Sequence, residues 1–111
     1  VGTTRVVASD AGEIASADDL RTLVLDVRTR LGDSAPSVVA VAGTSKGRPV
    51  VVVATNAPAR EAGLRAGALV RVASQVLGGG GGGKDDVAQG GGQDATQVRA
   101  ALEAIVAAVP A

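Results

Sequence analysis

The sequence predicts an α/β fold: a small mixed, mainly parallel sheet with helices packed on its faces and a glycine-rich loop between the last helices. Three observations support this class. Residues 37–42 and 49–55 are dominated by Val and Ala without polar alternation, as in strands that are covered on both faces. Residues 16–32 and 94–109 carry apolar side chains at helical spacing. Nine of the sixteen glycines lie in residues 76–92.

The first strand is predicted at 4–8, and an irregular connection around Gly12 follows it. Ser16 is then suited to cap a helix, with Asp19 as its capping-box partner. Gly32 is well placed to end this helix. The apolar stripe of the helix consists of Leu20, Leu23, Val24, Val27 and Leu31.

The two apolar runs are predicted to form a hairpin through 43–48, which is short and holds two glycines. A helix separates the first strand from the second, so a right-handed crossover and a parallel pairing are expected between them. Because the hairpin adds an antiparallel strand, the sheet is predicted to be mixed.

Asn56 is predicted to cap a helix of under two turns, with Pro58 in its first turn and Gly63 closing it. A longer helix begins near Arg65 and leads into the glycine run. Gly67 near its start would let another backbone come close.

A short strand is expected at 86–89, after the glycine run and before the last helix. Asp94 and Gln97 have the spacing of another cap, and Pro110 ends the helical pattern. The apolar stripe of this last helix consists of Val98, Ala101, Leu102, Ile105, Val106 and Val109.

The composition excludes several kinds of chemistry. A chain of 111 residues fits a single domain, 1–111. It contains no Phe, Tyr, Trp, Met, Cys or His, so stacking platforms for single-stranded nucleic acid, disulfides and Cys/His metal sites are all excluded. The commonest general base at neutral pH is also missing. Since no initiator Met and no signal peptide pattern are present, we expect a fragment of a longer protein.

The charges are unevenly distributed although the formal net charge is zero. Residues 44–84 hold six basic side chains and one acidic side chain, a net charge of +5, and the remainder carries −5. This asymmetry is consistent with one basic face on an otherwise acidic body. The charge pattern alone favours the alternative, in which these side chains are solvated on different faces.

The glycine run is either a flexible tether or a packed, functional loop. Ser and Pro are absent from it, and apolar Val87 and Ala88 separate its two glycine clusters. Such a pattern indicates close approach of the backbone to another backbone or to a ligand. Consecutive glycines also present N–H groups that bind phosphate and other anions, to which Lys84 would add charge. The plainer alternative is that the glycines only permit close packing.

Two chemical motifs are present only in part. The stretch from Gly78 to Lys84 is similar to a P-loop, but Asp85 stands where the hydroxyl residue is required and a helix precedes the run. Asp85 and Asp86 could approach a hard cation, yet such sites draw on more oxygen ligands than two adjacent carboxylates supply. Neither a P-loop nor a metal site is predicted.

A close resemblance to the C-terminal (C-Ala) domain of bacterial alanyl-tRNA synthetases is carried by two strings. They are GLRAGALV at 63–70 and VLGGGGGGKDDVAQGGG at 76–92. The resemblance covers essentially the whole chain. The same type of domain accompanies DHH-type phosphoesterases, where a His commonly follows the glycine run. This chain has Lys84 there, which favours the synthetase branch.

The resemblance implies a non-catalytic, cytoplasmic tRNA-binding domain. The parent enzyme joins alanine to its tRNA with ATP, magnesium and zinc as cofactors, none of which this segment is expected to hold. The domain is expected to contact the tRNA elbow and to aid aminoacylation and editing. The implied partners are tRNA(Ala) and the rest of the synthetase chain, with homodimerisation left open and no membrane. Contacts to tRNA are predicted at Arg60, Arg65, Arg71, Gly79, Gly80, Gly81, Gly82, Gly83, Lys84, Gln89, Gly90 and Gly91.

Two other functions remain open. One is a protein interaction or dimerisation module, in which RNA contact would be incidental. The other is the substrate-binding domain of a DHH-type phosphoesterase, which the missing His disfavours. RNA shape is read through backbone and 2′-hydroxyl contacts, which need no aromatic side chains, so the composition is compatible with the leading function.

Overall fold

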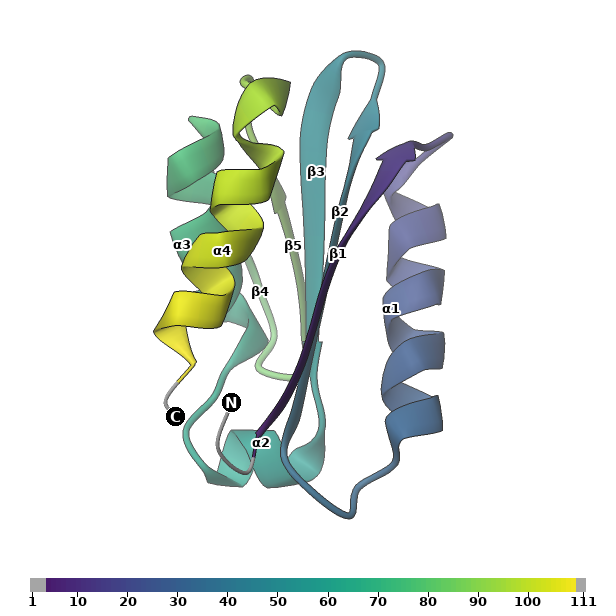
Figure 1. Ribbon diagram of the computed structural model, residues 1–111, viewed down its shortest axis with the longest axis vertical. Helices are drawn as coiled ribbons and strands as arrows, with labels where there is room; N and C mark the ends of the chain where they lie inside the picture. Colours follow the sequence, from purple (N-terminus) through teal and green to yellow (C-terminus); the bar gives the residue numbers. More distant parts are fainter. Residues whose placement is uncertain (1–3, 110–111) are drawn as a thin grey trace.

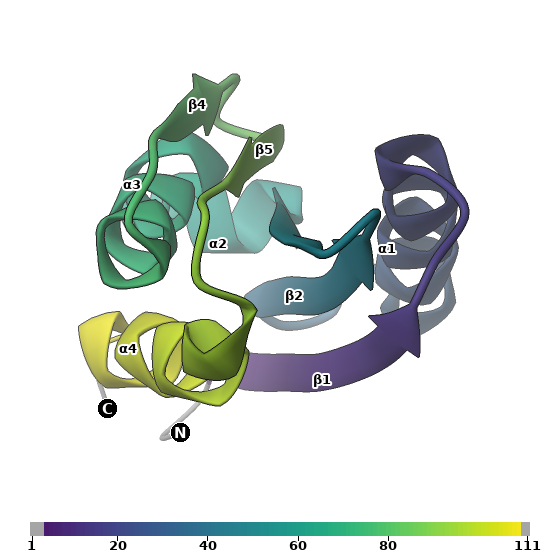
Figure 2. The same ribbon diagram turned by 90° about the horizontal axis from the view of Figure 1, so that it is seen from above.

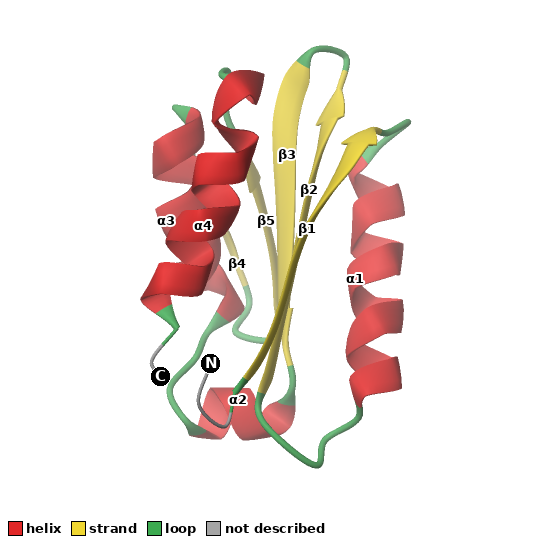
Figure 3. Cartoon of the chain, in the orientation of Figure 1, coloured by secondary structure: helices red, strands yellow, loops and turns green. Residues whose placement is uncertain are grey.

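The computed structural model describes residues 4–109, which build one five-stranded sheet in the order β1-β2-β3-β5-β4. The strands are β1 (Arg5–Glu13), β2 (Ser37–Ser45), β3 (Arg48–Thr55), β4 (Gly81–Gly83) and β5 (Val87–Gly91). The helices are α1 (Ala17–Leu31), α2 (Ala57–Glu61), α3 (Ala66–Leu77) and α4 (Val98–Ala108), with the 3₁₀ turn η1 (Ala95–Gln97) before the last. Figure 3 shows these elements by type.

The fold has three layers, with α1 on one face of the sheet and α3 and α4 on the other (Figure 1). Alternate residues of β3 serve the two cores: Val51 and Val53 pack toward α3 and α4, whereas Val52 and Ala54 pack toward α1. All four are fully buried. The prediction that β2 and β3 are covered on both faces is therefore confirmed, and an aromatic-free core fills the interior with Val, Leu, Ile and Ala.

The sheet is mixed, as predicted, but the prediction that it is mainly parallel is wrong. Only β1 and β2 pair in parallel; the pairs β2–β3, β3–β5 and β4–β5 are all antiparallel. Neighbouring strands are parallel only where a crossover connection brings the chain back before the next strand starts. The helix α1 returns the chain to the starting end of β1, whereas the tight turns after β2 and β4 each reverse its direction.

Strand β1 is longer than predicted, because residues 9–13 continue it instead of forming an irregular connection. This part of the strand is polar and exposed, since β1 lies at the edge of the sheet. Because these residues are not apolar, the hydrophobic pattern by which strands are predicted did not include them. Gly12 does mark an irregularity: its φ is 73° and its N–H donates to Asp10 Oδ1 at 2.9 Å, where the register with β2 shifts.

The helix boundaries follow the predicted caps, with two corrections at α1. Ser16 occupies the N-cap position, but its side chain makes no capping hydrogen bond, and its carbonyl accepts from Asp19 N instead. Leu23, predicted in the buried stripe, is 43% exposed, because α1 buries mainly the side that holds Leu20 and Val24. Gly32 ends the helix as predicted, with φ 71°.

Asn56 and Asp94 act as caps as predicted, but Asp94 N donates to Leu77 O, so Gln97 is not its capping-box partner. Asn56 Oδ1 accepts from Ala59 N at 3.1 Å at the start of α2. Asp94 Oδ1 accepts from Thr96 N at 3.0 Å at the start of η1, and α4 follows. Pro110, predicted to end the last helix, lies outside the described residues. Between residues 4 and 109, no helix combines the length and the hydropathy needed to cross a membrane.

Candidate functional site

The glycine run is an ordered hairpin. Gly78 ends α3 in the left-handed conformation, with φ 79° and ψ 29°, and the chain then forms β4, which pairs with β5. Figure 2 shows this hairpin at the far edge of the sheet, beside α3. The run is therefore a strand and turn of the sheet, and the flexible-tether alternative does not apply.

Six glycines of the hairpin are required by packing. A Cβ on Gly81 or on Gly90 would lie 2.8 Å from Val70 Cγ1 on α3, and a Cβ on Gly83 would lie 2.9 Å from Ala88 Cβ. Real Cβ atoms do not approach that closely. The remaining crowded positions are Gly79, Gly91 and Gly92, where a Cβ would meet neighbouring backbone.

Gly80 and Gly82 are different. A Cβ on either would meet nothing within 4 Å, and neither has a left-handed φ. Neither the backbone conformation nor the packing of the described chain requires glycine at these two positions. They leave a stretch of bare backbone at the surface of the hairpin.

The outer edge of β4 presents free peptide groups. Gly80 O accepts from Gly91 N at 3.3 Å, and Lys84 N donates to Val87 O at 3.1 Å. Antiparallel pairs alternate between hydrogen-bonded and non-bonded positions, so the N–H groups of Gly81 and Gly83 point away from β5. Since β4 is the last strand of the sheet, these donors lie on its open edge.

The predicted glycine-hairpin contacts divide between two faces. Gly81, Gly83 and Gly90 face α3, where they are packed. Gln89 pairs with Gly82 and with Val52, whose side chain belongs to the core under α1. Gln89 is exposed, whereas Val87, two residues earlier on the same face of β5, packs in the core under α1. Gln89 and the two open glycines, Gly80 and Gly82, are thus free to meet a ligand on the face away from α3, and the N–H groups of Gly81 and Gly83 are available at the edge of β4.

Thr55, at the end of β3, fixes the turn 84–86. Its N–H donates to Asp86 O at 2.9 Å, and its hydroxyl donates to Asp85 O at 2.6 Å. Ala66 N, at the start of α3, also donates to Asp85 O at 2.9 Å. This turn therefore holds together the hairpin, the centre of the sheet and the start of α3.

Three of the four predicted basic contacts adjoin this end of the sheet. Arg60 Nη1 donates to Thr55 O at 2.6 Å. Arg65 Nε lies 3.8 Å from Asp85 Oδ2 in an exposed ion pair, and Lys84 is an exposed residue of the turn itself. Arg71 does not join them, because it lies six residues, about 9 Å, further along α3.

The basic side chains of residues 44–84 do not share one face, which agrees with the alternative that the charge pattern favours. Lys46 and Arg48 lie at the β2–β3 turn, at the opposite end of β3 from Thr55. A strand of this length separates the two ends by about 23 Å. The strand β3 therefore separates Lys46 and Arg48 from the basic side chains near the turn 84–86.

Arg28 is a neighbour of the turn that the sequence did not reveal. Its Nη1 donates to Asp86 O at 3.2 Å and to Thr55 O at 3.4 Å. In the sequence Arg28 is a basic residue in the last turn of a helix, a placement that the helix dipole alone explains. Only the packing of α1 on the sheet brings it within reach of a turn 58 residues away.

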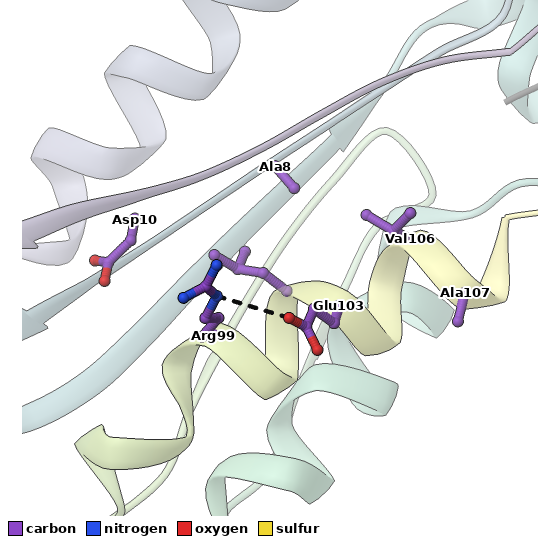
Figure 4. A pocket seen from close by; sticks show the side chains of 7 residues that line it. Ala8, Asp10, Arg99, Glu103, Val106 and Ala107 are labelled. Atoms are coloured by element: carbon purple, nitrogen blue, oxygen red, sulfur yellow. Dashed lines mark ion pairs between the residues drawn. The ribbon is translucent and has the colours of Figure 1, made fainter.

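Apart from the hairpin region, a groove lies between β1 and α4, as Figure 4 shows. It has a volume of about 590 Å³, and its apolar lining includes Ala8, Leu102 and Val106. Arg99 and Glu103, whose Nε and Oε1 are 3.7 Å apart, lie at its rim. This groove is far from the glycine hairpin, because β1 and β4 are the two opposite edge strands of the sheet.

Catalytic machinery is not evident in the described part of the chain. Residues 4–109 contain no group of three or more His, Cys, Asp or Glu side chains placed to hold a metal ion. The three ion pairs found among the described residues are exposed and join Arg30 with Asp26, Arg65 with Asp85 and Arg99 with Glu103. The features of the hairpin region are those of a binding surface: bare backbone, an open strand edge and guanidinium groups.

Comparison with known proteins gives a consistent result. A model of the DHHA1 domain matches residues 3–110. The alanine–tRNA ligase of Kineococcus radiotolerans is 71% identical over 101 residues, which cover 91% of this chain and 11% of that protein. The enzyme of the same name from Paenarthrobacter aurescens is 66% identical over 105 residues, covering 95% of this chain and 12% of that protein. The chain thus spans about a tenth of the length of these relatives.

The fold also matches a solved structure. The C-Ala domain from Aquifex aeolicus alanyl-tRNA synthetase has a TM-score of 0.72 with this chain at 25% sequence identity. The match covers 90% of this chain and 84% of that one.

Proposed function

The chain belongs to the DHHA1 domain family, and from that premise we propose that it is the tRNA-binding C-terminal domain of an alanine–tRNA ligase. In this role it binds the elbow of tRNA(Ala) and supports aminoacylation and editing by catalytic domains elsewhere in the parent enzyme. ATP, magnesium and zinc serve those other domains. The parent enzyme acts in the cytoplasm.

The observation that carries the proposal is the pair of open glycines. Gly80 and Gly82 are glycine although neither backbone nor packing demands it. A ligand that lies directly on the main chain is a sufficient reason for the missing side chains. The ribose-phosphate backbone suits that approach, because its acceptor oxygens accept from backbone N–H groups.

The charges beside the hairpin support the same ligand. Arg60, Arg65 and Lys84 lie around the turn 84–86, where phosphate contacts would come from guanidinium and ammonium groups. Asp85 offsets part of this charge through its pair with Arg65. Since exposed pairs of this kind are weak, Arg65 is able to exchange its carboxylate for a phosphate.

The proposal is tested with the double variant Gly80→Ala/Gly82→Ala. Two methyl groups in open space leave the fold intact but hold RNA away from the backbone, so the affinity for a tRNA(Ala) transcript is expected to fall about tenfold. Unfolding in urea checks that the stability is retained. An unchanged affinity in a stably folded variant would remove the main support for RNA binding at this surface.

A second measurement locates the contact directly. Adding tRNA is expected to slow hydrogen exchange at the backbone amides of 78–92, and most at Gly81 and Gly83, whose N–H groups face the open edge of β4. If the protected amides lie only on α4 and β1, the RNA surface has been assigned to the wrong edge.

A protein-interaction module is the second candidate, favoured by the apolar groove beside α4 (Figure 4). Sedimentation of the chain with and without tRNA separates the two functions. A monomer that shifts only with tRNA supports RNA binding, whereas self-association that tRNA does not alter supports the interaction module. A DHH-type phosphoesterase role is disfavoured by Lys84, which stands where a His commonly follows the glycine run.

A further inference from the structure

A polar cleft lies at the end of the sheet where α1 ends and α2 begins, next to the turn 84–86. Figure 1 shows these three segments at the same end of the molecule. The cleft has a volume of about 300 Å³, which is at the lower limit of small-ligand sites. Its lining includes Arg28, Gly32, Asp33, Asn56, Arg60 and Asp86.

Two guanidinium groups converge in this cleft. Arg28 and Arg60, from different helices, both donate through Nη1 to the carbonyl oxygen of Thr55, at 3.4 Å and 2.6 Å. Thr55 is fully buried, so its carbonyl fixes the position of both groups. A guanidinium has five N–H donors, and these bonds leave most of them available to a ligand.

The wall of the cleft is held by a buried side chain. Asn56 is 2% exposed, and its Oδ1 accepts from Ser37 N and Ala59 N. Its Nδ2 donates to Gly32 O at 3.0 Å and to Ala35 O at 2.8 Å. All hydrogen-bonding positions of this amide are therefore used within the protein, and the end of α1 is fixed against the start of α2.

The cleft also contains two carboxylates, those of Asp33 and Asp86. Neither has an ion pair or a side-chain hydrogen bond with any residue that the structure describes. A bare anion in the cleft would meet these carboxylates, and a cation would meet the guanidinium groups. A ligand that carries both an anionic group and hydroxyl donors satisfies all four side chains.

We propose that this cleft binds one ribonucleotide unit of an RNA chain, with its phosphate on Arg28 and Arg60 and its sugar hydroxyl donating to the exposed carboxylate of Asp33. Carboxylates are suited to accept from ribose hydroxyls, and the 2′-hydroxyl distinguishes RNA from DNA. The inference rests on the proposed RNA-binding function. Asp86 belongs to the same turn as Lys84, so the cleft continues the surface of the glycine hairpin.

The variant Asp33→Ala tests the carboxylate. Asp33 is exposed, so its removal should not disturb the fold. Binding is compared for a tRNA(Ala) transcript and a DNA strand of the same sequence. We expect the ratio of RNA to DNA affinity to fall about tenfold, the scale of a hydrogen bond to a charged group. If the carboxylate only repels phosphate, both affinities rise together and the ratio is unchanged, which overturns the inference.

Glu13→Ala is the matched control, because it removes an exposed carboxylate at the end of β1, away from α2 (Figure 1). It is expected to leave the ratio unchanged. Arg28→Gln tests the phosphate contact: the slope of log affinity against log salt should become shallower by about one unit. A slope that stays the same in a folded Arg28→Gln variant overturns the phosphate assignment.

A free nucleotide offers the same chemistry, so 5′-AMP is included as a competitor. A single unit lacks the hairpin contacts, and we expect it not to displace tRNA at comparable concentration. Displacement by 5′-AMP would assign the cleft to free nucleotides and overturn the RNA inference. If the wild-type chain binds no RNA, the proposed function fails. If the chain binds RNA and Lys84→Ala weakens that binding, the proposed function stands. An unchanged RNA-to-DNA ratio in Asp33→Ala then overturns only the inference about the cleft.

Discussion

Gly90 lies directly against the Ser74 hydroxyl, so close that a Cβ at position 90 would collide with Ser74 Oγ. This contact fixes the distance between the glycine hairpin and α3. The same geometry predicts that Gly90→Ala destabilises the protein by about 2 kcal/mol, because an overpacked core must shift its backbone or side chains. The free energy of unfolding in urea measures this.

Gly82→Ala is the matched control for that variant, since Gly82 is in the same hairpin but has open space beside it. Its stability is expected to equal or exceed that of the wild type by about 0.5 kcal/mol, because alanine loses less backbone entropy than glycine on folding. Equal losses of stability for Gly82→Ala and Gly90→Ala would contradict the two-sided description of the hairpin.

Ser74→Ala is predicted to be neutral or to stabilise the protein by about 1 kcal/mol. Ser74 is fully buried and its Oγ has no hydrogen-bond partner in the described chain. A buried hydroxyl without a partner carries a desolvation cost that alanine does not. The combination Ser74→Ala/Gly90→Ala should cost less than Gly90→Ala alone, which a double-mutant cycle tests. A marked loss of stability in Ser74→Ala would show that the hydroxyl has a partner, such as an internal water.

Asn56→Ala is expected to lower the free energy of unfolding by about 3 kcal/mol. The change leaves two buried N–H donors and two carbonyl acceptors without the partner that Asn56 supplies, and each such loss is costly. Urea unfolding gives the value. Asn56→Asp retains the acceptor but not the donors, so its carboxylate would face the carbonyls of Gly32 and Ala35. It should therefore be destabilised as well, and a fully stable Asp variant would argue against the described network.

Replacing both Lys84 and Arg65 with alanine should weaken tRNA binding and reduce its salt dependence. Each phosphate contact contributes somewhat under one unit to the slope of log affinity against log salt, so the slope should become shallower by about one to two units. Filter binding at several salt concentrations provides the measurement.

Arg48→Ala is the control for this charge change, because Arg48 is exposed at the other end of β3. Its salt slope should match that of the wild type. An equal effect of Arg48→Ala would mean that the chain attracts RNA through its overall charge and not through the turn 84–86.

Local signals in the sequence were sufficient for much of the fold. The glycine and asparagine at positions 32 and 56 marked helix ends, because the left-handed conformation and the capping amide are properties of single residues. The unbroken apolar character of β2 and β3 predicted burial on both faces. The polar edge strand β1 was underestimated beyond position 8, because an edge strand does not need the apolar residues by which strands are recognised.

The candidate site was predictable in its composition and not in its arrangement. The glycine run, Lys84 and Arg65 were evident from the string that carries the family resemblance. The string did not show that Gly81 and Gly90 serve packing while Gly80 and Gly82 are open, because that division depends on which side of β4 faces α3.

The sequence by itself determined the family, the caps at Gly32 and Asn56, the apolar strands and the absence of Cys and His chemistry, since each depends on residue type or on neighbours a few positions away. Tertiary structure alone decided the antiparallel majority of the sheet, the separation of Arg48 from Arg60 and the arrival of Arg28 beside Asp86. Those features depend on where segments distant in the sequence meet when α1 and α3 pack on opposite faces of the sheet. A local sequence pattern does not contain that information.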